Sequence, residues 1–208
     1  MGAVPGKFIT LEGGEGVGKS TQLAAVANAL RGRGLTVVTT REPGGSPGAE
    51  AIRALLLSGD DDRWSAEAEA LLFAAARTDH LDKVVRPALA AGQWVLCDRF
   101  LDSSLAYQGG AGGLEIDRVR AINAFGIGDT MPDRTLLLRL ADGAARARHR
   151  DFGGSDRIGG RPAVYHVAVD AGFAAVAAAE PERVRIVDAS GAPADVTARL
   201  LAALGDLL

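Results

Sequence analysis

Residues 13–20 read GGEGVGKS and match the pattern G-x-x-x-x-G-K-[ST], with Lys19 and Ser20 in its last two places. Glycine lets successive backbone N–H groups turn inward around an anion, where a Cβ would obstruct the approach. The pattern follows an apolar run and precedes residues with helical spacing, so the positive end of a helix would face the same anion. In this setting the lysine reaches the terminal phosphates of a nucleotide and the serine hydroxyl coordinates Mg²⁺. These residues predict a nucleotide-phosphate site.

A phosphate-binding loop alone is compatible with a motor, a switch, an ATPase or a kinase. A GTPase switch would need an [NT]-K-x-D motif to read its base, and no lysine of the sequence has that setting. A second candidate group is Asp98-Arg99, which follows the apolar run WVLC. The carboxylate can hold Mg²⁺ through water, and the guanidinium can bind a second phosphate. The alternative interpretation is an ion pair at a strand end without a catalytic role.

A basic segment, ARARHRDFGGSDRIGGR, contains two Gly pairs and no long apolar run. Its arginines are Arg146, Arg148, Arg150, Arg157 and Arg161. The composition predicts a lid over about residues 146–161. Arginines that a lid delivers can stabilise the charge on a transferred phosphoryl group while the lid excludes water. A solvated loop with surface charges is the competing interpretation.

Phe73 and Arg77 lie four residues apart and therefore on one face of a predicted helix. A ring and a forked donor in this arrangement can stack on a base and hydrogen-bond its edge. Spacing alone favours a simpler interpretation, a core phenylalanine beside an exposed arginine. Tyr107-Gln108-Gly109 is similarly compatible with a helix end that has a glycine cap.

The elements that would position these groups alternate along the chain. Short apolar runs predict strands, and the stretches between them have helical spacing. The predicted strands are residues 7–12, 35–40, 93–97, 134–140 and 183–187. Strands that are apolar throughout and separated by helices are typical of a parallel sheet covered on both faces. The sequence therefore predicts a three-layer α/β/α fold with a five-stranded parallel sheet.

Two helical stretches carry specific expectations. The Ala-rich stretch from Ser65 to Ala91 predicts a helix with a break at Pro87, because proline cannot donate to the helical ladder. The last helix is expected to begin at Pro193, a favourable first-turn residue.

Composition limits the classes of function. The chain has 208 residues, which favours a single domain over residues 1–208. Its net charge of −3 argues against a nucleic-acid partner, and no apolar run is long enough to cross a bilayer. Cys97 is the single cysteine, which excludes an intrachain disulfide and a thiolate cluster. We expect Cys97 to be buried and the protein to be cytoplasmic.

Six stretches together resemble the bacterial thymidylate kinase family: FITLEGGEGVGKST, TREPGG, LLFAAAR, LCDRF, SSLAYQG and SDRI. Their order and spacing match the family, and they extend from near the N-terminus into the predicted lid. The resemblance implies the P-loop NTPase fold of the nucleoside monophosphate kinases. It also implies the Mg²⁺-dependent reaction ATP + dTMP → ADP + dTDP, in a homodimer.

The resemblance also implies residue roles. The ATP phosphates would be held by Gly13, Gly14, Glu15, Gly16, Val17, Gly18, Lys19, Ser20 and Thr21. The dTMP would be held by Arg53, Phe73, Arg77, Arg99, Ser104, Tyr107 and Gln108. Phe73 would stack on thymine, Arg77 would bond its edge, and Tyr107 would disfavour a ribose 2′-hydroxyl. Ser20 and Asp98 would be the Mg²⁺ residues, and Glu15 would lie near the sugar and the acceptor phosphate.

The source of the transition-state arginine follows from the loop. In this family an arginine either follows the acidic residue of the loop or comes from the lid, and here Gly16 follows Glu15. The lid is therefore expected to supply it, with Arg157 as the first candidate and Arg148 or Arg150 as the second.

Some positions depart from the family's pattern. These are Arg139, Gly159, Ala168 and Asp170. They concern the lid side of the site and leave the acceptor residues in place. A kinase for a different small acceptor, and a switch or binding module that holds ATP without transferring phosphate, remain as alternative functions.

Overall fold

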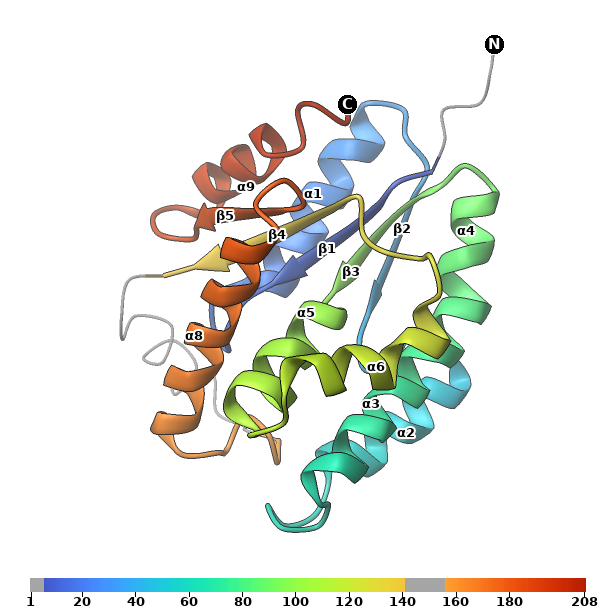
Figure 1. The fold of residues 1–208 in the computed structure, drawn as a ribbon. Coiled ribbons are helices and arrows are strands. Elements are labelled where there is room, and N and C mark those ends of the chain that lie inside the picture. The colour runs from blue at the N-terminus through green and yellow to red at the C-terminus, as the bar shows by residue number, and fades with distance from the viewer. Residues whose placement is uncertain (1–5, 141–155) are drawn as a thin grey trace.

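The computed structural model describes residues 6–140 and 156–208. Within these ranges five strands form one parallel sheet in the order β2-β3-β1-β4-β5 (Figure 1). Their bounds are β1 Phe8–Glu12, β2 Val37–Arg41, β3 Trp94–Asp98, β4 Arg134–Arg139 and β5 Val184–Asp188. The predicted parallel sheet is confirmed, and each observed strand overlaps its predicted range.

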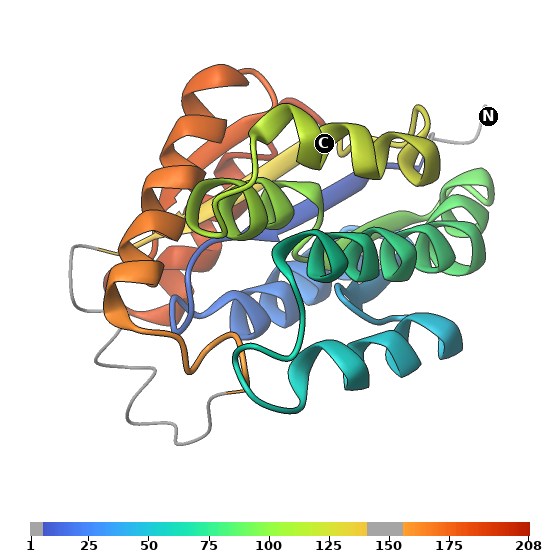
Figure 2. The same ribbon diagram turned by 60° about the horizontal axis from the view of Figure 1, so that its bottom comes forward.

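Helices cover both faces of this sheet. The α-helices are α1 Lys19–Gly32, α2 Pro47–Leu57, α3 Ala66–His80, α4 Arg86–Ala90, α5 Leu101–Ser104, α6 Ile116–Ile127, α8 Ala163–Ala179 and α9 Pro193–Ala202. Two π-helical segments are η1 Leu81–Val85 and η2 Leu105–Ala111. Helices α1 and α9 pack on one face, and α4, α5 and α8 lie on the other. Helices α2 and α3 lie side by side at the margin of the molecule (Figure 2).

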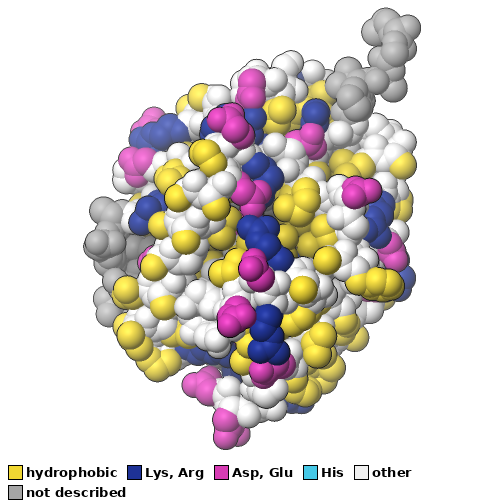
Figure 3. All heavy atoms as spheres, viewed as in Figure 1, with side chains coloured by type: hydrophobic (Ala, Val, Ile, Leu, Met, Phe, Trp, Pro, Cys, Tyr) yellow, Lys and Arg dark blue, Asp and Glu magenta, His cyan; other side chains and the backbone are white. Residues whose placement is uncertain are grey.

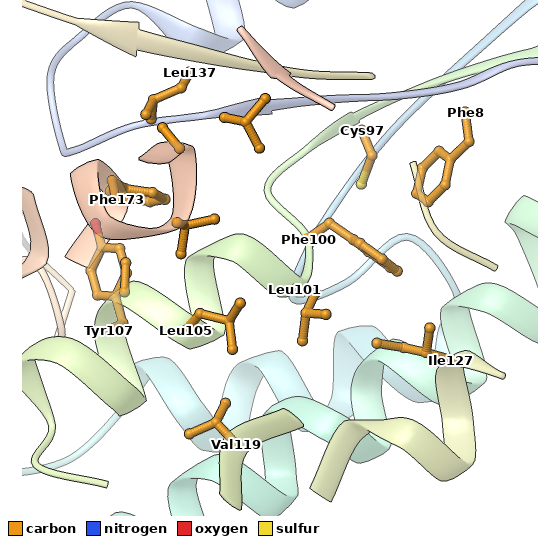
Figure 4. Packing of buried hydrophobic residues seen from close by; sticks show 14 of the residues in the cluster. Phe8, Cys97, Phe100, Leu101, Leu105, Tyr107, Val119, Ile127, Leu137 and Phe173 are labelled. Atoms are coloured by element: carbon orange, nitrogen blue, oxygen red, sulfur yellow. The ribbon is translucent and has the colours of Figure 1, made fainter. Parts of the chain in front are cut away.

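The period of two along each strand separates the core into two layers. Ile9 and Leu11 of β1 are fully buried against α1 and α9. Phe8 faces the other layer, where its ring meets Phe100 edge to face with centroids 5.0 Å apart. Figure 4 shows this second layer, with Cys97 between the strands and the helices. Cys97 is free and buried, as predicted.

The helical stretch after Ser65 corrects one expectation. The Ser65 hydroxyl caps α3 by accepting from the Ala68 N–H at 3.3 Å. No break follows at Pro87, because the backbone keeps helical dihedral angles through η1 and into α4. The wider π-helical turns of η1 come just before Pro87. In a regular α-helix the proline ring would collide with the carbonyl of the residue four positions earlier. The chain therefore absorbs Pro87 without leaving the helix.

The order of the strands creates a crevice at one edge of the sheet. Strands β1 and β3 are neighbours in parallel register, with Leu11 opposite Asp98. The chain leaves β1 toward α1 on one face and leaves β3 toward α5 on the other face. Ligands of open α/β sheets bind where neighbouring connections diverge in this way. The loops after β1 and β3 are thus the expected walls of a site.

Segment η2 packs closely against α8. A Cβ on Gly172 would come within 2.9 Å of the Ala106 Cα, so the two backbones touch. Tyr107 and Gln108 are buried inside η2, and Gly109 does not end a helix, contrary to the simpler interpretation of these residues. The close contact fixes the position of both side chains relative to α8.

The described part of the chain contains no helix with the length and apolar character needed to span a membrane. The face drawn in Figure 3 intersperses acidic and basic side chains and has no extended basic area. This distribution agrees with the modest negative net charge of the sequence.

Candidate active site

A cavity of about 650 Å³ lies at the carboxyl edge of the sheet, between the loops that follow β1 and β3. It is lined by fourteen of the predicted site residues: Glu15, Gly16, Gly18, Lys19, Ser20, Thr21, Arg53, Phe73, Arg77, Asp98, Arg99, Ser104, Tyr107 and Gln108. They come from five separate stretches of the chain. The fold therefore brings most of the predicted donor and acceptor residues to one cavity.

The glycine-rich loop joins β1 to α1 in the way the pattern requires. Gly13 has a φ of 136°, and a Cβ there would lie 2.4 Å from the Leu138 carbonyl oxygen. Gly18, with a φ of 96°, precedes the first residue of α1. No acidic side chain lies in the first turn of α1, and Gly18 provides no side-chain cap. The positive end of the helix is therefore available to an anion in the cavity.

Lys19 is folded back over this loop. Its Nζ donates to the carbonyls of Gly13 and Gly14 at 3.1 and 2.8 Å, and the residue is only 7% exposed. Burial first, and then the positive charge of Arg99, lower the pKa of Lys19 to about 8. The ammonium group is thus held at the floor of the cavity by hydrogen bonds to two neutral carbonyls. Such a cation is well suited to a polyphosphate that enters the loop.

Arg99 occupies the turn after β3 with a φ of 72°, a left-handed conformation that is uncommon for residues other than glycine. Its guanidinium donates to Glu15 Oε1 at 2.7 Å, to the Gly13 carbonyl at 3.1 Å and to Ser103 Oγ at 3.0 Å. It also lies over the Tyr107 ring, 5.0 Å from the centroid. These contacts fix a fork-shaped cation between the phosphate loop and the rest of the cavity.

Asp98 and Ser20 offer oxygen ligands at the donor end. Ser20 Oγ donates to Asp98 Oδ2 at 3.0 Å, whereas Asp98 Oδ1 is buried and has no hydrogen-bond partner among the described residues. The described part of the chain contains no cluster of three or more His, Cys, Asp or Glu side chains that could hold a metal ion. A single carboxylate and a hydroxyl suit Mg²⁺, which is held by few protein oxygens together with substrate phosphates and water. The residues present therefore fit this ion.

The opposite end of the cavity contains Phe73 and Arg77, one helical turn apart on α3. Phe73 is half-buried and lines the cavity, and Arg77 is only 2% exposed. The expectation of a core phenylalanine with an exposed arginine is therefore wrong for Arg77. Its Nε donates to Glu42 Oε2 at 2.7 Å, and one terminal nitrogen donates to the Phe100 carbonyl at 3.0 Å. The guanidinium is a fixed part of the wall.

Ser104 lies directly against this arginine. Its Oγ accepts from both terminal nitrogens of Arg77, at 3.1 Å each. Gln108 and Tyr107 follow on η2, and the Tyr107 hydroxyl donates to Glu15 Oε1 at 3.2 Å. These polar groups line the same cavity as the apolar side chain of Phe73, a combination typical of a site for a planar heterocycle.

The remaining predicted residues lie elsewhere. Gly13, Gly14 and Val17 belong to the loop but do not line the cavity. The Val17 side chain packs in the core between the sheet and α1. Arg157 is buried against α3 and does not line the cavity, whereas its neighbours on both sides do. Arg148 and Arg150 lie outside the described residues. The catalytic role of a lid arginine stays a prediction.

Several residues of the site were missed by sequence reasoning. Glu42, inside the quoted stretch TREPGG, is 4% exposed and accepts from Arg77 and from the ring of His80. Asn123 Oδ1 accepts from Arg77 at 2.5 Å. Ser103 and Glu12 support Arg99 from the other side. A charged residue at the end of an apolar strand, such as Glu12, was the one signal available.

Glu12 is buried completely at the carboxyl end of β1. Ser103 Oγ donates to its Oε2 at 2.6 Å, and the Phe100 N–H donates to its Oε1 at 2.7 Å. Burial first, and then the negative charge of Asp102, raise the pKa of Glu12 from 4.5 to about 7. Arg99 and the donors Ser103 and Phe100 act in the opposite direction. The charged form is therefore disfavoured in the folded state.

This pKa predicts a pH dependence of stability. A raised folded-state pKa contributes stability that is complete below about 4.5 and is lost as the pH rises through about 7. Wild type should therefore lose a few kcal/mol relative to Glu12→Gln as the pH rises across this range. Urea unfolding of both proteins at several pH values measures the difference. The same comparison with Glu182→Gln, whose side chain is 95% exposed, is the control. A difference that stays constant with pH would contradict the expectation.

Comparison with protein-family models gives a match described as thymidylate kinase over residues 11–200. A curated thymidylate kinase of Rhizorhabdus wittichii is 59% identical over 207 residues, which cover 99% of this chain and 100% of that protein. A curated thymidylate kinase of Afipia carboxidovorans is 48% identical, covering 94% of this chain and 87% of that protein.

A solved structure gives the same result for the fold. The crystal structure of thymidylate kinase from Ehrlichia chaffeensis superimposes with a TM-score of 0.79 at 30% sequence identity. The match covers 96% of this chain and 100% of that one.

Proposed function

The chain belongs to the thymidylate kinase family, whose members transfer the γ-phosphoryl group of ATP to dTMP, and we propose that the cavity around Lys19 and Arg99 carries out this transfer. The observation that carries the proposal is the convergence of a phosphate loop and an aromatic-arginine pocket on one cavity. All of residues 1–208 are assigned to one kinase domain.

The phosphate loop is assigned to ATP. Its backbone N–H groups and the N-terminus of α1 bind the phosphates, and Lys19 moves from the Gly13 and Gly14 carbonyls onto the terminal phosphate oxygens. Support comes from the buried position of Lys19, since a buried ammonium gains more from an anion than from two neutral carbonyls.

The pocket at the opposite end is assigned to dTMP. Phe73 stacks on thymine, and Arg77, Ser104 and Gln108 surround the base edge. Arg99 and Arg53 bind the acceptor phosphate, with Arg99 aligned by its contacts to the loop. Arg99 and Lys19 are then the two cations on either side of the transferred group.

Catalysis in this arrangement is positioning and electrostatic stabilisation. Once ATP is bound, Lys19 and Arg99 are both in place and need little reorganisation when charge develops. Mg²⁺, when bound through Ser20 and Asp98, would neutralise charge on the phosphate oxygens. The cavity orients the acceptor phosphate toward the donor loop. A lid arginine, Arg148 or Arg150, is the remaining member of the proposed catalytic set, and its removal would lower kcat. Arg157, the other candidate from the sequence, donates to Glu69 and does not line the cavity, so it is left out of this set.

The test is ADP release in a coupled assay with ATP, Mg²⁺ and a panel of acceptors. The panel contains dTMP, dUMP, dCMP, UMP, AMP and GMP. We expect dTMP to give the highest kcat/KM and chelation of Mg²⁺ to abolish turnover. Preference for AMP or UMP would reassign the base pocket but leave the donor site in place. Tight ATP binding without ADP formation from any acceptor would favour a binding module instead.

A homodimer and a cytoplasmic location are further proposals. Leu71 on α3 and Phe125 on α6 are 57% and 96% exposed, and these two helices pack against each other. An apolar surface of this kind supports association with a second copy. Sedimentation of wild type and Phe125→Glu tests it, because the charged variant should be monomeric. The free thiol of Cys97 supports a reducing compartment, which cell fractionation would test.

A further inference from the structure

One buried carboxylate, that of Glu69 on α3, joins three separate parts of the chain. Its Oε2 accepts from Arg157 Nη2 at 2.5 Å and from Arg161 Nη2 at 2.7 Å. Its Oε1 accepts from Gln108 Nε2 at 3.0 Å. Burial alone would raise the pKa of Glu69, but the Arg157 hydrogen bond and the Arg161 charge hold it below the ordinary value. We call these four residues, Glu69, Gln108, Arg157 and Arg161, the Glu69 clasp.

Among the described residues, none of the hydrogen-bond partners of the Arg157 side chain lines the main cavity. Its Nε donates to the Leu56 carbonyl at 2.8 Å and its Nη1 to the Asp61 carbonyl at 3.3 Å, while Nη2 is on Glu69. Its backbone N–H donates to the Leu57 carbonyl at 3.3 Å. Figure 2 shows this segment, in orange, beside the end of α2. The guanidinium therefore ties residue 157 to α2 and α3.

The residues on either side of Arg157 form part of the cavity wall. Asp156 and Ile158 both line the main cavity, which also contains Phe73 and Arg53. Ile158 is buried in the same apolar cluster against which Phe73 packs. The hydrogen bonds that fix Arg157 therefore also fix this part of the cavity wall, which faces the proposed dTMP position.

A second, smaller cavity of about 270 Å³ lies behind the clasp. Glu69, Arg161, Trp64 and Tyr165 line it, and Gln108 lines both cavities. The hydrogen bond between Glu69 and Gln108 thus crosses the partition between the two spaces. Loss of this bond would free the Gln108 amide and open the acceptor pocket toward the second cavity.

We propose that Glu69 is a positioning residue for the acceptor: through the Glu69 clasp it fixes Gln108 and the wall at residues 156–158 against dTMP. Arg157 acts in this proposal as a partner of Glu69 and touches neither the donor nor the transferred phosphoryl group. The inference rests on the proposed assignment of dTMP to the main cavity.

The test is a double-mutant cycle with Glu69→Gln, Arg157→Gln and the double variant. We expect each single change to raise KM for dTMP by on the order of tenfold, with kcat and KM for ATP changed less than about threefold. The double variant should be no worse than the more impaired single variant, because both changes remove one shared interaction. Glu67→Gln, on the same helix with a side chain 53% exposed, is the matched control and should behave as wild type.

Two results would overturn the proposal. One is a kcat lowered by about 10³ in Arg157→Gln while Glu69→Gln resembles wild type, as expected of a transition-state arginine. The other is KM values for dTMP that the single changes leave unaltered. Thermal melting checks that the variants fold. Should Arg157→Gln fail to fold, Arg157→Lys, which keeps the charge and loses the fork, replaces it in the cycle. Calorimetric binding of dTMP to wild type tests the pocket assignment separately.

Discussion

Replacing Lys19 with alanine is expected to lower kcat by a factor on the order of 10³ or more. The side chain is buried at the floor of the cavity, and its ammonium group donates to the Gly13 and Gly14 carbonyls. ATP would replace these carbonyls by phosphate oxygens, so the interaction strengthens as charge develops during transfer. Steady-state kinetics with saturating ATP and dTMP measure the loss. Turnover near that of wild type would exclude the proposed mechanism.

The matched control is Lys83→Ala, because that lysine has a side chain 57% exposed and pairs with Asp79 on a helix surface. It should leave kcat unchanged. The lowered pKa of Lys19 supplies an independent measurement. Since the ammonium form prevails below about 8, kcat/KM for ATP should fall as the pH rises above that value. In Lys19→Ala this decline should be absent from the residual activity.

Replacing Arg99 with alanine is expected to lower kcat/KM for dTMP by about 10² to 10³ and to change KM for ATP much less. The change removes the fork-shaped cation between the loop and the acceptor pocket. It also leaves the Glu15 carboxylate without its 2.7 Å partner, so an acceptor phosphate would approach a negative charge. The measurement is a full set of initial rates in which ATP and dTMP are varied separately.

Arg99→Lys separates charge from shape. Both residues have a Cβ and meet the same cost at a φ of 72°, so the backbone is equally disfavoured in each. We expect the lysine variant to keep an intermediate activity, about tenfold below wild type in kcat/KM. Arg118→Ala, on an exposed face of α6 with a side chain 58% exposed, is the control. An Arg99→Ala enzyme within about threefold of wild type would remove Arg99 from the acceptor site.

The donor end of the site was predictable because its parts are contiguous. The loop from Gly13 to Ser20 lies between one strand and one helix, and each function in it depends on residue type at a fixed spacing. Asp98-Arg99 was predictable for a related reason, since the end of an apolar strand in a parallel sheet must reach the same edge. Local pattern and sheet geometry together were sufficient.

The acceptor end was less predictable because its side chains are fixed by distant residues. Spacing suggested an exposed Arg77, but Glu42 and Asn123 bury its guanidinium from 35 and 46 positions away. Neither partner has a local signal. The resemblance to a family identified Arg77 as a site residue, and only the folded chain showed what holds it.

Arg157 illustrates the same limit from the other direction. Its position in a basic, glycine-rich segment favoured a role at the transferred phosphate. Its partner Glu69 lies 88 positions earlier, on a helix whose sequence gives no sign of a buried carboxylate.

The predicted break at Pro87 failed because a π-helical segment accommodates the proline ring. Sequence periodicity does not distinguish such a segment from an α-helix.

The bond pattern at Ser104 has a consequence for which bases the cavity can accept. A hydroxyl has two lone pairs and one hydrogen, and both lone pairs of Ser104 already accept from Arg77. Toward the cavity the Ser104 hydroxyl can therefore donate a hydrogen bond but cannot accept one. A base that reaches this point must offer an acceptor, such as a carbonyl oxygen or an unprotonated ring nitrogen, because an exocyclic amine would place one donor against another. The pocket would distinguish bases by the polarity of their edges, as proteins do in the major groove of DNA.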